Sequence, residues 1–194
     1  MIDAQAQKPA APAGGGSKKA IAIVVTLALT AVFIYVVVAA FKRGPAAVHE
    51  VPFMLAGKPA PAFKMKRLDN GQEVELKDLI GKKPIVINFW ATWCEPCKAE
   101  WPVIEWGHQN YGDQVEFFGV VFEDSEDNVK RFSRDNHSAI TQLFDPKSTV
   151  AVDYAVSGVP ETYFIDRNGI IKGKIAEPIM DPRIMSARVQ ELLR

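Results

Sequence analysis

The chain has 194 residues, of which 48% are hydrophobic, and its 23 Lys and Arg residues balance its 23 Asp and Glu residues. This length and composition suit one globular domain plus an appendage. The neutral charge balance contains no basic field of the kind that binds nucleic acid, so we expect no nucleic-acid partner.

The N-terminal part of the chain contains one long apolar segment. Residues 1–19 include a Pro/Ala/Gly-rich stretch with almost nothing to bury, which predicts a disordered tail. Residues 20–41 contain no charge, a length that can cross the hydrocarbon core of a bilayer as a helix and that exceeds the apolar region of a cleaved signal peptide. A buried core helix is the alternative, but only Thr26, Thr30 and Tyr35 interrupt the apolar pattern. We therefore predict an uncleaved transmembrane signal anchor in a lipid bilayer.

The orientation of this anchor is weakly encoded. Three lysines precede the apolar segment and two basic residues follow it, so charge gives a slight preference for a cytoplasmic N-terminus. The cysteine usage fits an exported domain, because stray thiols mispair in an oxidising compartment. We place the globular part on the extracytoplasmic (periplasmic) face of the cell membrane.

The segment after the anchor leads into the folded domain. Residues 42–58 carry scattered Gly and Pro and are predicted to be a linker, so the domain extends over residues 59–194. Its first elements should be two short strands, at 62–68 and 72–76, because they flank an Asn-Gly pair. That pair is a strong hairpin turn signal.

Strand and helix patterns alternate through the rest of the domain. The predicted strands are 85–90, 115–122, 162–166 and 170–176, and the predicted helices are 95–110, 125–136, 145–154 and 181–194. The first of these strands is a continuous β-branched and aromatic run, as expected of a strand buried on both faces. Ser125 and Asp181 are the predicted N-caps of two helices. Because hairpins and crossovers both occur, we predict an α/β fold with a mixed sheet.

The two cysteines of the chain, Cys94 and Cys97, stand three positions apart between a predicted strand and a predicted helix. A disulfide that closes so short a loop contributes little stability through chain entropy. The three histidines stand in no zinc-ligand spacing to the cysteines, and Lys98 occupies the position where covalent haem attachment needs a His. We expect no metal and no other cofactor, and we predict a reversible dithiol/disulfide pair.

The neighbours of the cysteines predict their roles. Cys94 lies just before the helix, where free N–H groups and the helix dipole lower the pKa of a thiol, so it is the predicted attacking sulfur. Cys97, one turn inside, should be more buried and resolve the mixed disulfide, while Pro96 stiffens the turn. Glu95 is favoured by the dipole, but its charge opposes thiolate formation, so we predict that it lowers the reduction potential. Trp93 is the predicted exposed contact surface for the substrate.

Several linked stretches resemble a known family. They are NFWATWCEPCKAEWP, the opening APAFKMKRLDNGQEVELKDLIGKKPIVI, and GVPETYFIDRNGIIKGKI. They are similar to the membrane-anchored thioredoxin-like proteins of the TlpA/ResA/CcmG type, which supply reductant for cytochrome c maturation. The stretch DPKSTVAVDYAVSGVPETYFID is especially close to the CcmG (DsbE) branch. The resemblance covers about residues 56–194. It implies a thioredoxin fold with an N-terminal β-hairpin extension, and a cis-proline loop that faces the dithiol.

The resemblance places that loop at Val159-Pro160. In a cis-proline geometry the Val159 backbone could pair with an extended substrate strand by β-augmentation. Glu161 follows, and two interpretations of it stay open. It is either a solvated loop carboxylate or a group close enough to the dithiol to tune or deprotonate Cys97.

One position departs from cytosolic thioredoxins. Where their motif places a buried aspartate, this chain has Asn88, which cannot accept a proton. Glu161, Glu95, Glu123 or water must then take the proton.

These residues predict a membrane-tethered thiol:disulfide oxidoreductase that acts mainly as a reductant. The resemblance implies the CXXCH disulfide of apocytochrome c as substrate and a membrane thiol-disulfide protein as electron donor. One alternative is a reductase of other exported disulfide proteins. Another is a copper-binding chaperone on a similar fold, for which a CxxxC spacing and a dedicated downstream His would be expected.

Overall fold

The computed structural model describes residues 16–42 and 53–194, and the chain divides into two compact units between residues 51 and 52. The described part of the first unit is the helix α1 (Gly16–Lys42), which covers the segment predicted as an anchor. Among the described residues, no helix combines the length and the apolar character needed to cross a membrane. The predicted membrane span is therefore not confirmed. Most of the predicted tail and the greater part of the predicted linker lie outside the described residues.

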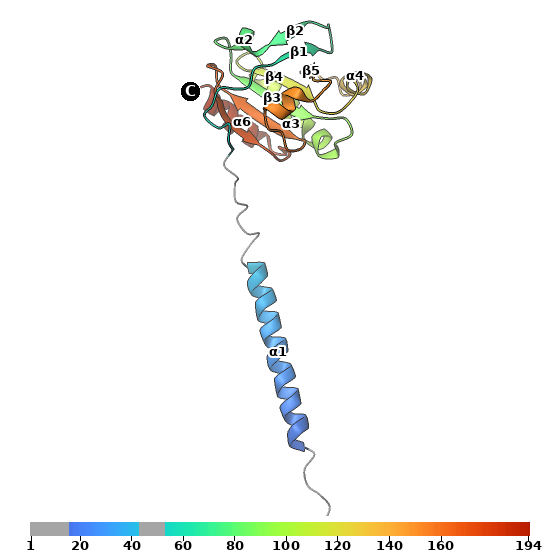
Figure 1. Ribbon diagram of the computed structural model, residues 1–194, viewed down its shortest axis with the longest axis vertical. Helices are drawn as coiled ribbons and strands as arrows, with labels where there is room; N and C mark the ends of the chain where they lie inside the picture. Colours follow the sequence, from blue (N-terminus) through green and yellow to red (C-terminus); the bar gives the residue numbers. More distant parts are fainter. Residues whose placement is uncertain (1–15, 43–52) are drawn as a thin grey trace, which may run out of the picture. The chain divides into compact units, whose positions relative to one another are not determined.

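The second unit is built on a seven-stranded sheet (Figure 1). Its strands are β1 (Lys64–Arg67), β2 (Glu73–Glu75), β3 (Ile85–Trp90), β4 (Glu116–Val121), β5 (Thr141–Phe144), β6 (Glu161–Ile165) and β7 (Ile171–Ile175). They lie in the order β2-β1-β5-β4-β3-β6-β7. β4 runs parallel to both of its neighbours, β3 and β5, whereas the other neighbouring pairs are antiparallel. The predicted mixed sheet and the predicted N-terminal hairpin, formed by β1 and β2, are confirmed.

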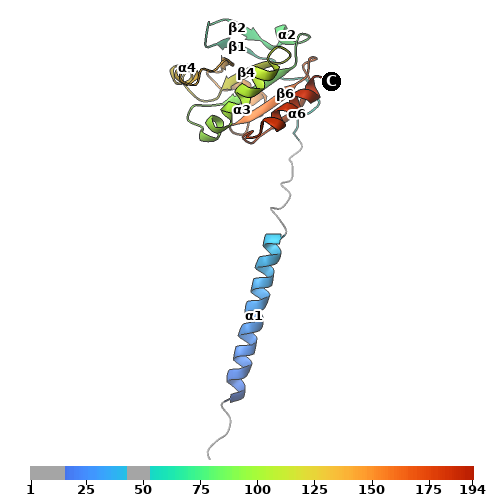
Figure 2. The same cartoon turned by 180° about the vertical axis from the view of Figure 1, so that it is seen from behind.

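Helices cover both faces of this sheet. They are α2 (Leu76–Leu79), α3 (Glu95–Tyr111), α4 (Glu126–Asp135), α5 (Thr149–Asp153) and α6 (Pro182–Leu192). One buried apolar cluster lies between the sheet and α3, α4 and α6, and it includes both cysteines. A second cluster fills the opposite face, where α2 and α5 lie. Figure 2 shows α3 and α6 packed on one side of the sheet. The predicted N-caps Ser125 and Asp181 are both confirmed by side-chain hydrogen bonds to the following turn.

The structure adds two elements to the prediction, α2 and β5. In β5 the middle of the strand is polar, because Gln142 is buried there and its Oε1 accepts a hydrogen bond from the Trp90 indole at 2.8 Å. This polar residue interrupts the apolar run that would have marked a buried strand. The predicted helix at 145–154 is shorter than expected, since Asp145 instead caps α5 by accepting bonds from three of its first amides.

The folded domain begins before its predicted boundary. Phe53 packs against Tyr163 with ring centroids 5.6 Å apart. The Gly57 N–H donates to the carbonyl of Ile171 in β7 at 2.8 Å. Segment 53–58, predicted as the end of the linker, is therefore part of the domain and protects an outer strand of the sheet.

Candidate active site

The two cysteines lie where β3 leads into α3, and they form a disulfide. Cys94 is the N-cap of α3, and the Cys97 N–H donates to the Cys94 sulfur at 3.1 Å. This bond and the positive end of the helix dipole both stabilise negative charge on Cys94. Cys97 is fully buried, whereas Cys94 keeps 4% of its surface exposed. Both cysteines are thus buried, and the one that keeps some exposed surface is the one whose sulfur lies at the helix N-terminus.

The loop before β6 faces this disulfide. The Val159-Pro160 peptide is cis, which confirms the geometry that the resemblance implied. The carbonyl oxygen of Val159 lies 3.6 Å from the Cys94 sulfur, and no hydrogen bond among residues 53–194 uses the Val159 N–H. A hollow of about 310 Å³ adjoins the loop, and Pro96 forms part of its wall. An extended peptide could therefore pair with Val159 while its disulfide reaches Cys94.

A second loop carries Trp93, the residue directly before Cys94. The indole is 55% exposed and its N–H donates to the Glu123 carbonyl at 3.0 Å. Thr92, the residue before Trp93, donates from both its amide and its hydroxyl to the Asp124 carboxylate. Burial would raise the pKa of Asp124, but the hydrogen bonds from Thr92 and from Asn128 outweigh it and lower the pKa. The ionised carboxylate fixes the loop, and the loop holds Trp93 in the position expected of a contact surface.

A carboxyl group that sequence reasoning missed lies on the inner side of the disulfide. Glu100, in α3, is fully buried. Its Oε1 accepts from Asn88 Nδ2 at 2.8 Å and its Oε2 from the Ile179 N–H at 2.9 Å. Burial raises the pKa of Glu100 to about 7, although both hydrogen bonds act in the opposite direction. A buried carboxyl that titrates near neutral pH is suited to take the proton that Cys97 releases.

The position of Glu100 contains the signal that could have revealed it. It follows Cys97 by three residues, so both side chains lie on one face of α3. The next residue, Trp101, and Ile104 are buried on this side as well. A charged residue on the buried face of a helix, one turn after a redox cysteine, is a functional candidate on periodicity alone.

Two of the carboxylates predicted as proton acceptors are directed elsewhere. Glu95 is exposed and pairs with Lys98, and the Glu123 side chain is also exposed. Neither side chain is buried with Cys97. In the described segments, 16–42 and 53–194, no group of three or more His, Cys, Asp or Glu side chains is arranged to hold a metal ion.

Glu161 corresponds to neither interpretation left open by the sequence. It is buried in β6, and its strand neighbour on the same face, Tyr163, belongs to the apolar cluster opposite the cysteines. Its carboxylate accepts hydrogen bonds from the amide and hydroxyl of Ser157, from Tyr163 and from Lys174. Burial would raise the pKa of Glu161, but these bonds outweigh it and lower the pKa. Because Ser157 opens the loop that carries Pro160, the ionised Glu161 holds that loop in place.

Comparison with known proteins agrees with this arrangement. Residues 56–174 match the AhpC/TSA family. The chain is 35% identical over 146 residues to the thiol:disulfide interchange protein HelX of Rhodobacter capsulatus, covering 75% of this chain and 81% of HelX. It is 33% identical over 141 residues to the thiol:disulfide interchange protein DsbE of Escherichia coli, covering 71% of this chain and 74% of DsbE.

A solved structure extends the agreement to three dimensions. The secreted Mycobacterium tuberculosis disulfide oxidoreductase described as homologous to E. coli DsbE superposes with a TM-score of 0.61 at 26% identity, covering 67% of this chain and 96% of that chain. With the Cys94–Cys97 disulfide at the start of α3, these matches show that the chain belongs to the thioredoxin-like AhpC/TSA family and is a thiol:disulfide oxidoreductase of the DsbE/HelX type.

Proposed function

We propose that this oxidoreductase reduces disulfides of exported proteins, and that the CXXCH disulfide of apocytochrome c is its substrate. The observation that carries the proposal is the asymmetry of the two cysteines. Cys94 keeps 4% of its surface exposed and its sulfur lies 3.6 Å from the carbonyl of Val159, whose N–H has no partner among residues 53–194, while Cys97 is fully buried. Attack on a substrate disulfide needs an accessible thiolate, and release needs a second thiol within reach. This site provides both.

The two thiols of Cys94 and Cys97 supply both electrons that the substrate disulfide needs. The Cys94 thiolate attacks one sulfur of the substrate disulfide, so a Cys94–substrate bond forms while the substrate S–S bond breaks and leaves a substrate thiolate. Cys97 then attacks Cys94, which forms the disulfide seen here and releases the second substrate sulfur. Two electrons pass to the substrate, and the Cys97 proton passes to Glu100. A membrane thiol-disulfide protein is the proposed donor that reduces the pair again.

The choice of substrate rests on similarity rather than on geometry. The relatives are named thiol:disulfide interchange proteins, and the sequence stretches around both active-site loops resemble the branch that serves cytochrome c maturation. A reductase of other exported disulfide proteins would use the same dithiol. Identification of the trapped partner separates these two possibilities.

Trapping with Cys97→Ala in the whole chain is the decisive experiment. Without the resolving thiol, Cys94 should remain joined to its substrate, and mass spectrometry should identify a CXXCH peptide. Cys94→Ala is the matched control, because it leaves the fully buried Cys97 as the single thiol and should trap nothing. Equal trapping by both variants would contradict the assigned roles, and a partner without a CXXCH motif would contradict the substrate.

Tethering to the extracytoplasmic face of a membrane is part of the proposal. Its support is the uncharged sequence of residues 20–41, which lies within α1. In the same proposal a tail precedes α1 (Gly16–Lys42) and a linker joins it to the domain. The full chain should stay in the membrane fraction after alkaline washing, and a chain that lacks residues 20–41 should not. Release of both by the wash would reject the tether.

A further inference from the structure

Asn88 has a buried oxygen atom without a hydrogen-bond partner. Its side chain is fully buried in β3. Nδ2 uses both of its hydrogens, one toward Glu100 Oε1 at 2.8 Å and one toward Thr162 Oγ1 at 3.0 Å. Oδ1 accepts no hydrogen bond from any residue in the described part of the domain. A buried carbonyl oxygen without a donor is unfavourable, so a donor is expected in some state of the protein.

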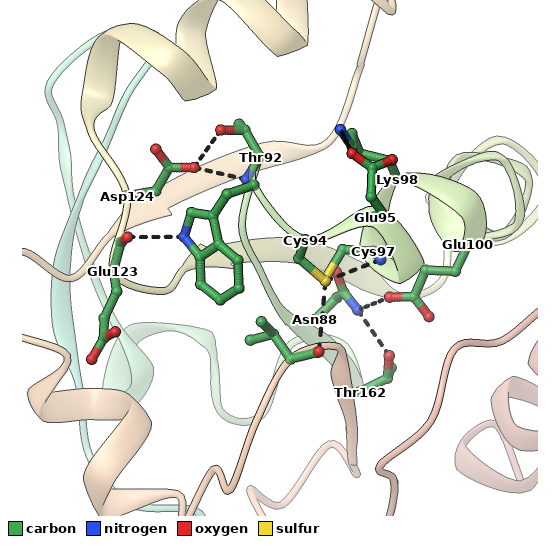
Figure 3. The surroundings of a disulfide bond; sticks show 12 residues. Asn88, Thr92, Cys94, Glu95, Cys97, Lys98, Glu100, Glu123, Asp124 and Thr162 are labelled. Carbon is green, nitrogen blue, oxygen red and sulfur yellow. Dashed lines mark hydrogen bonds and ion pairs between the residues drawn. A yellow bond between two sulfur atoms is a disulfide. The ribbon is translucent and has the colours of Figure 1, made fainter.

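The location of Asn88 identifies that donor. Its β3 neighbours two positions away, Val86 and Trp90, belong to the cluster that contains the cysteines, so by the period of a strand the side chain of Asn88 lies on the same face. Figure 3 shows Asn88 on the inner side of the disulfide, next to Cys97 and Glu100. In the disulfide neither sulfur carries a proton. Reduction creates an S–H group on Cys97, and an S–H group is a hydrogen-bond donor.

We propose that Asn88 is a positioning residue whose Oδ1 accepts the Cys97 S–H hydrogen bond in the reduced protein, while its Nδ2 continues to orient Glu100. Reduction of the disulfide by an incoming dithiol transfers two electrons and two protons, and one of those protons stays on Cys97. The buried oxygen gains a partner only in the reduced form. Asn88 therefore favours the dithiol over the disulfide. This inference rests on the thiol:disulfide activity and is independent of which protein is the substrate.

The orientation of the Asn88 amide follows from its neighbours. If the amide were turned over, Oδ1 would stand where Nδ2 now meets Glu100 at 2.8 Å, and two acceptors would face each other. The turned amide requires a protonated Glu100. It would present an N–H to Cys97, which stabilises the thiolate and lowers the pKa of Cys97. The two amide orientations therefore predict opposite changes in the pKa of Cys97 when the Asn88 side chain is removed.

The variant Asn88→Ala, measured in the whole reduced protein, distinguishes the two amide orientations. Loss of an acceptor for the S–H group should lower the pKa of Cys97, followed by NMR of its ¹³Cβ, because the neutral thiol is no longer favoured. The exchange equilibrium with dithiothreitol should move toward the disulfide by about 2-fold, the lower end of the range for one hydrogen bond, because an S–H group is a weak donor. Thr162→Val is the matched control. It removes another partner of Asn88 but leaves Oδ1 in place, so both quantities should stay near those of the parent protein.

Two further measurements test whether Asn88 Oδ1 acts on Cys97 directly. In a Glu100→Gln background, Asn88→Ala should still lower the pKa of Cys97; if the effect disappears, Asn88 acts through Glu100 alone and the proposal is wrong. A rise in the pKa of Cys97, or no change, would also overturn it. If Asn88→Ala does not fold, the infrared S–H band of Cys97 in a Cys94→Ala protein decides. It should lie at the lower frequency of a hydrogen-bonded thiol, and a band at the free-thiol frequency would reject the contact.

Discussion

Replacing Glu100 by Gln should change how the stability of the protein depends on pH. Burial raises the pKa of this carboxyl to about 7 from its ordinary value of 4.5. The folded protein therefore holds the proton more tightly than the unfolded chain does. The carboxyl costs nothing below the unfolded pKa, and it destabilises the folded state progressively as the pH rises toward 7. At about 1.4 kcal/mol for each pKa unit, the full cost is about 3 kcal/mol.

The Gln side chain removes this cost but introduces a smaller one. Its NH₂ group cannot accept from Asn88 or from the Ile179 N–H, so one of these two bonds is lost at every pH. A lost bond that leaves a buried donor unpaired costs about 1 to 2 kcal/mol. The Gln variant should therefore be about 1 kcal/mol less stable than the parent at pH 5 and about 2 kcal/mol more stable at pH 8.

Urea unfolding of the oxidised whole chain at both pH values measures this difference. Glu95→Gln is the matched control, because it makes the same change on the same helix at an exposed carboxylate, and its difference from the parent should vary little with pH. A difference for Glu100→Gln that is equal at pH 5 and pH 8 would refute the assignment of a raised pKa. The same variant should slow the release step of the mixed disulfide about 100-fold at pH 8, as expected on loss of a general base. An unchanged release rate would show that another group takes the proton.

Three other predictions concern the isolated domain, Glu161 and Glu95. A fragment of residues 52–194 should fold and reduce a model disulfide as fast as the whole chain, and loss of dithiol activity on removing α1 would contradict the separation of domain and anchor. Glu161→Gln should cost about 1 to 3 kcal/mol at pH 7 in urea unfolding. The lowered pKa of Glu161 stabilises the fold above the unfolded pKa and this contribution is lost as the pH falls, so a loss that does not shrink in acid would reject the ionised carboxylate. Glu95→Gln should raise the reduction potential only slightly, because Lys98 and solvent screen the charge, and Glu95→His should raise it more. Equilibration with dithiothreitol measures both, and an unchanged or lower potential in the His variant would show that Glu95 only stabilises the helix turn.

Apolar runs and turn dipeptides, which are read from neighbouring residues, were sufficient to predict most of the fold. The apolar run of β3 and the Asn-Gly turn between β1 and β2 correspond to the elements observed. β5 and the role of Glu100 were missed for a shared reason: each places a polar side chain inside the protein, where a binary pattern expects an apolar one. Gln142 is buried because it has the Trp90 indole as its partner, and Glu100 because it has Asn88 and Ile179. Those partners come from other strands and loops, so only the tertiary fold reveals them.

Glu100 and Glu161 are both buried, and they differ in the number of hydrogen-bond donors that meet them. Glu161 receives four hydrogen bonds, one of them from the cationic Lys174, and it therefore stays ionised and holds a loop. Glu100 receives two, neither from a cation, so the cost of burying its charge is only partly compensated. A carboxylate with many donors cannot take a proton easily, while one with few donors can. The period of β6 keeps the two apart, because Glu161 faces away from the cysteines whereas its neighbour Thr162 pairs with Asn88 beneath them. The site can therefore combine a rigid substrate loop with a proton-exchanging group without one disturbing the other.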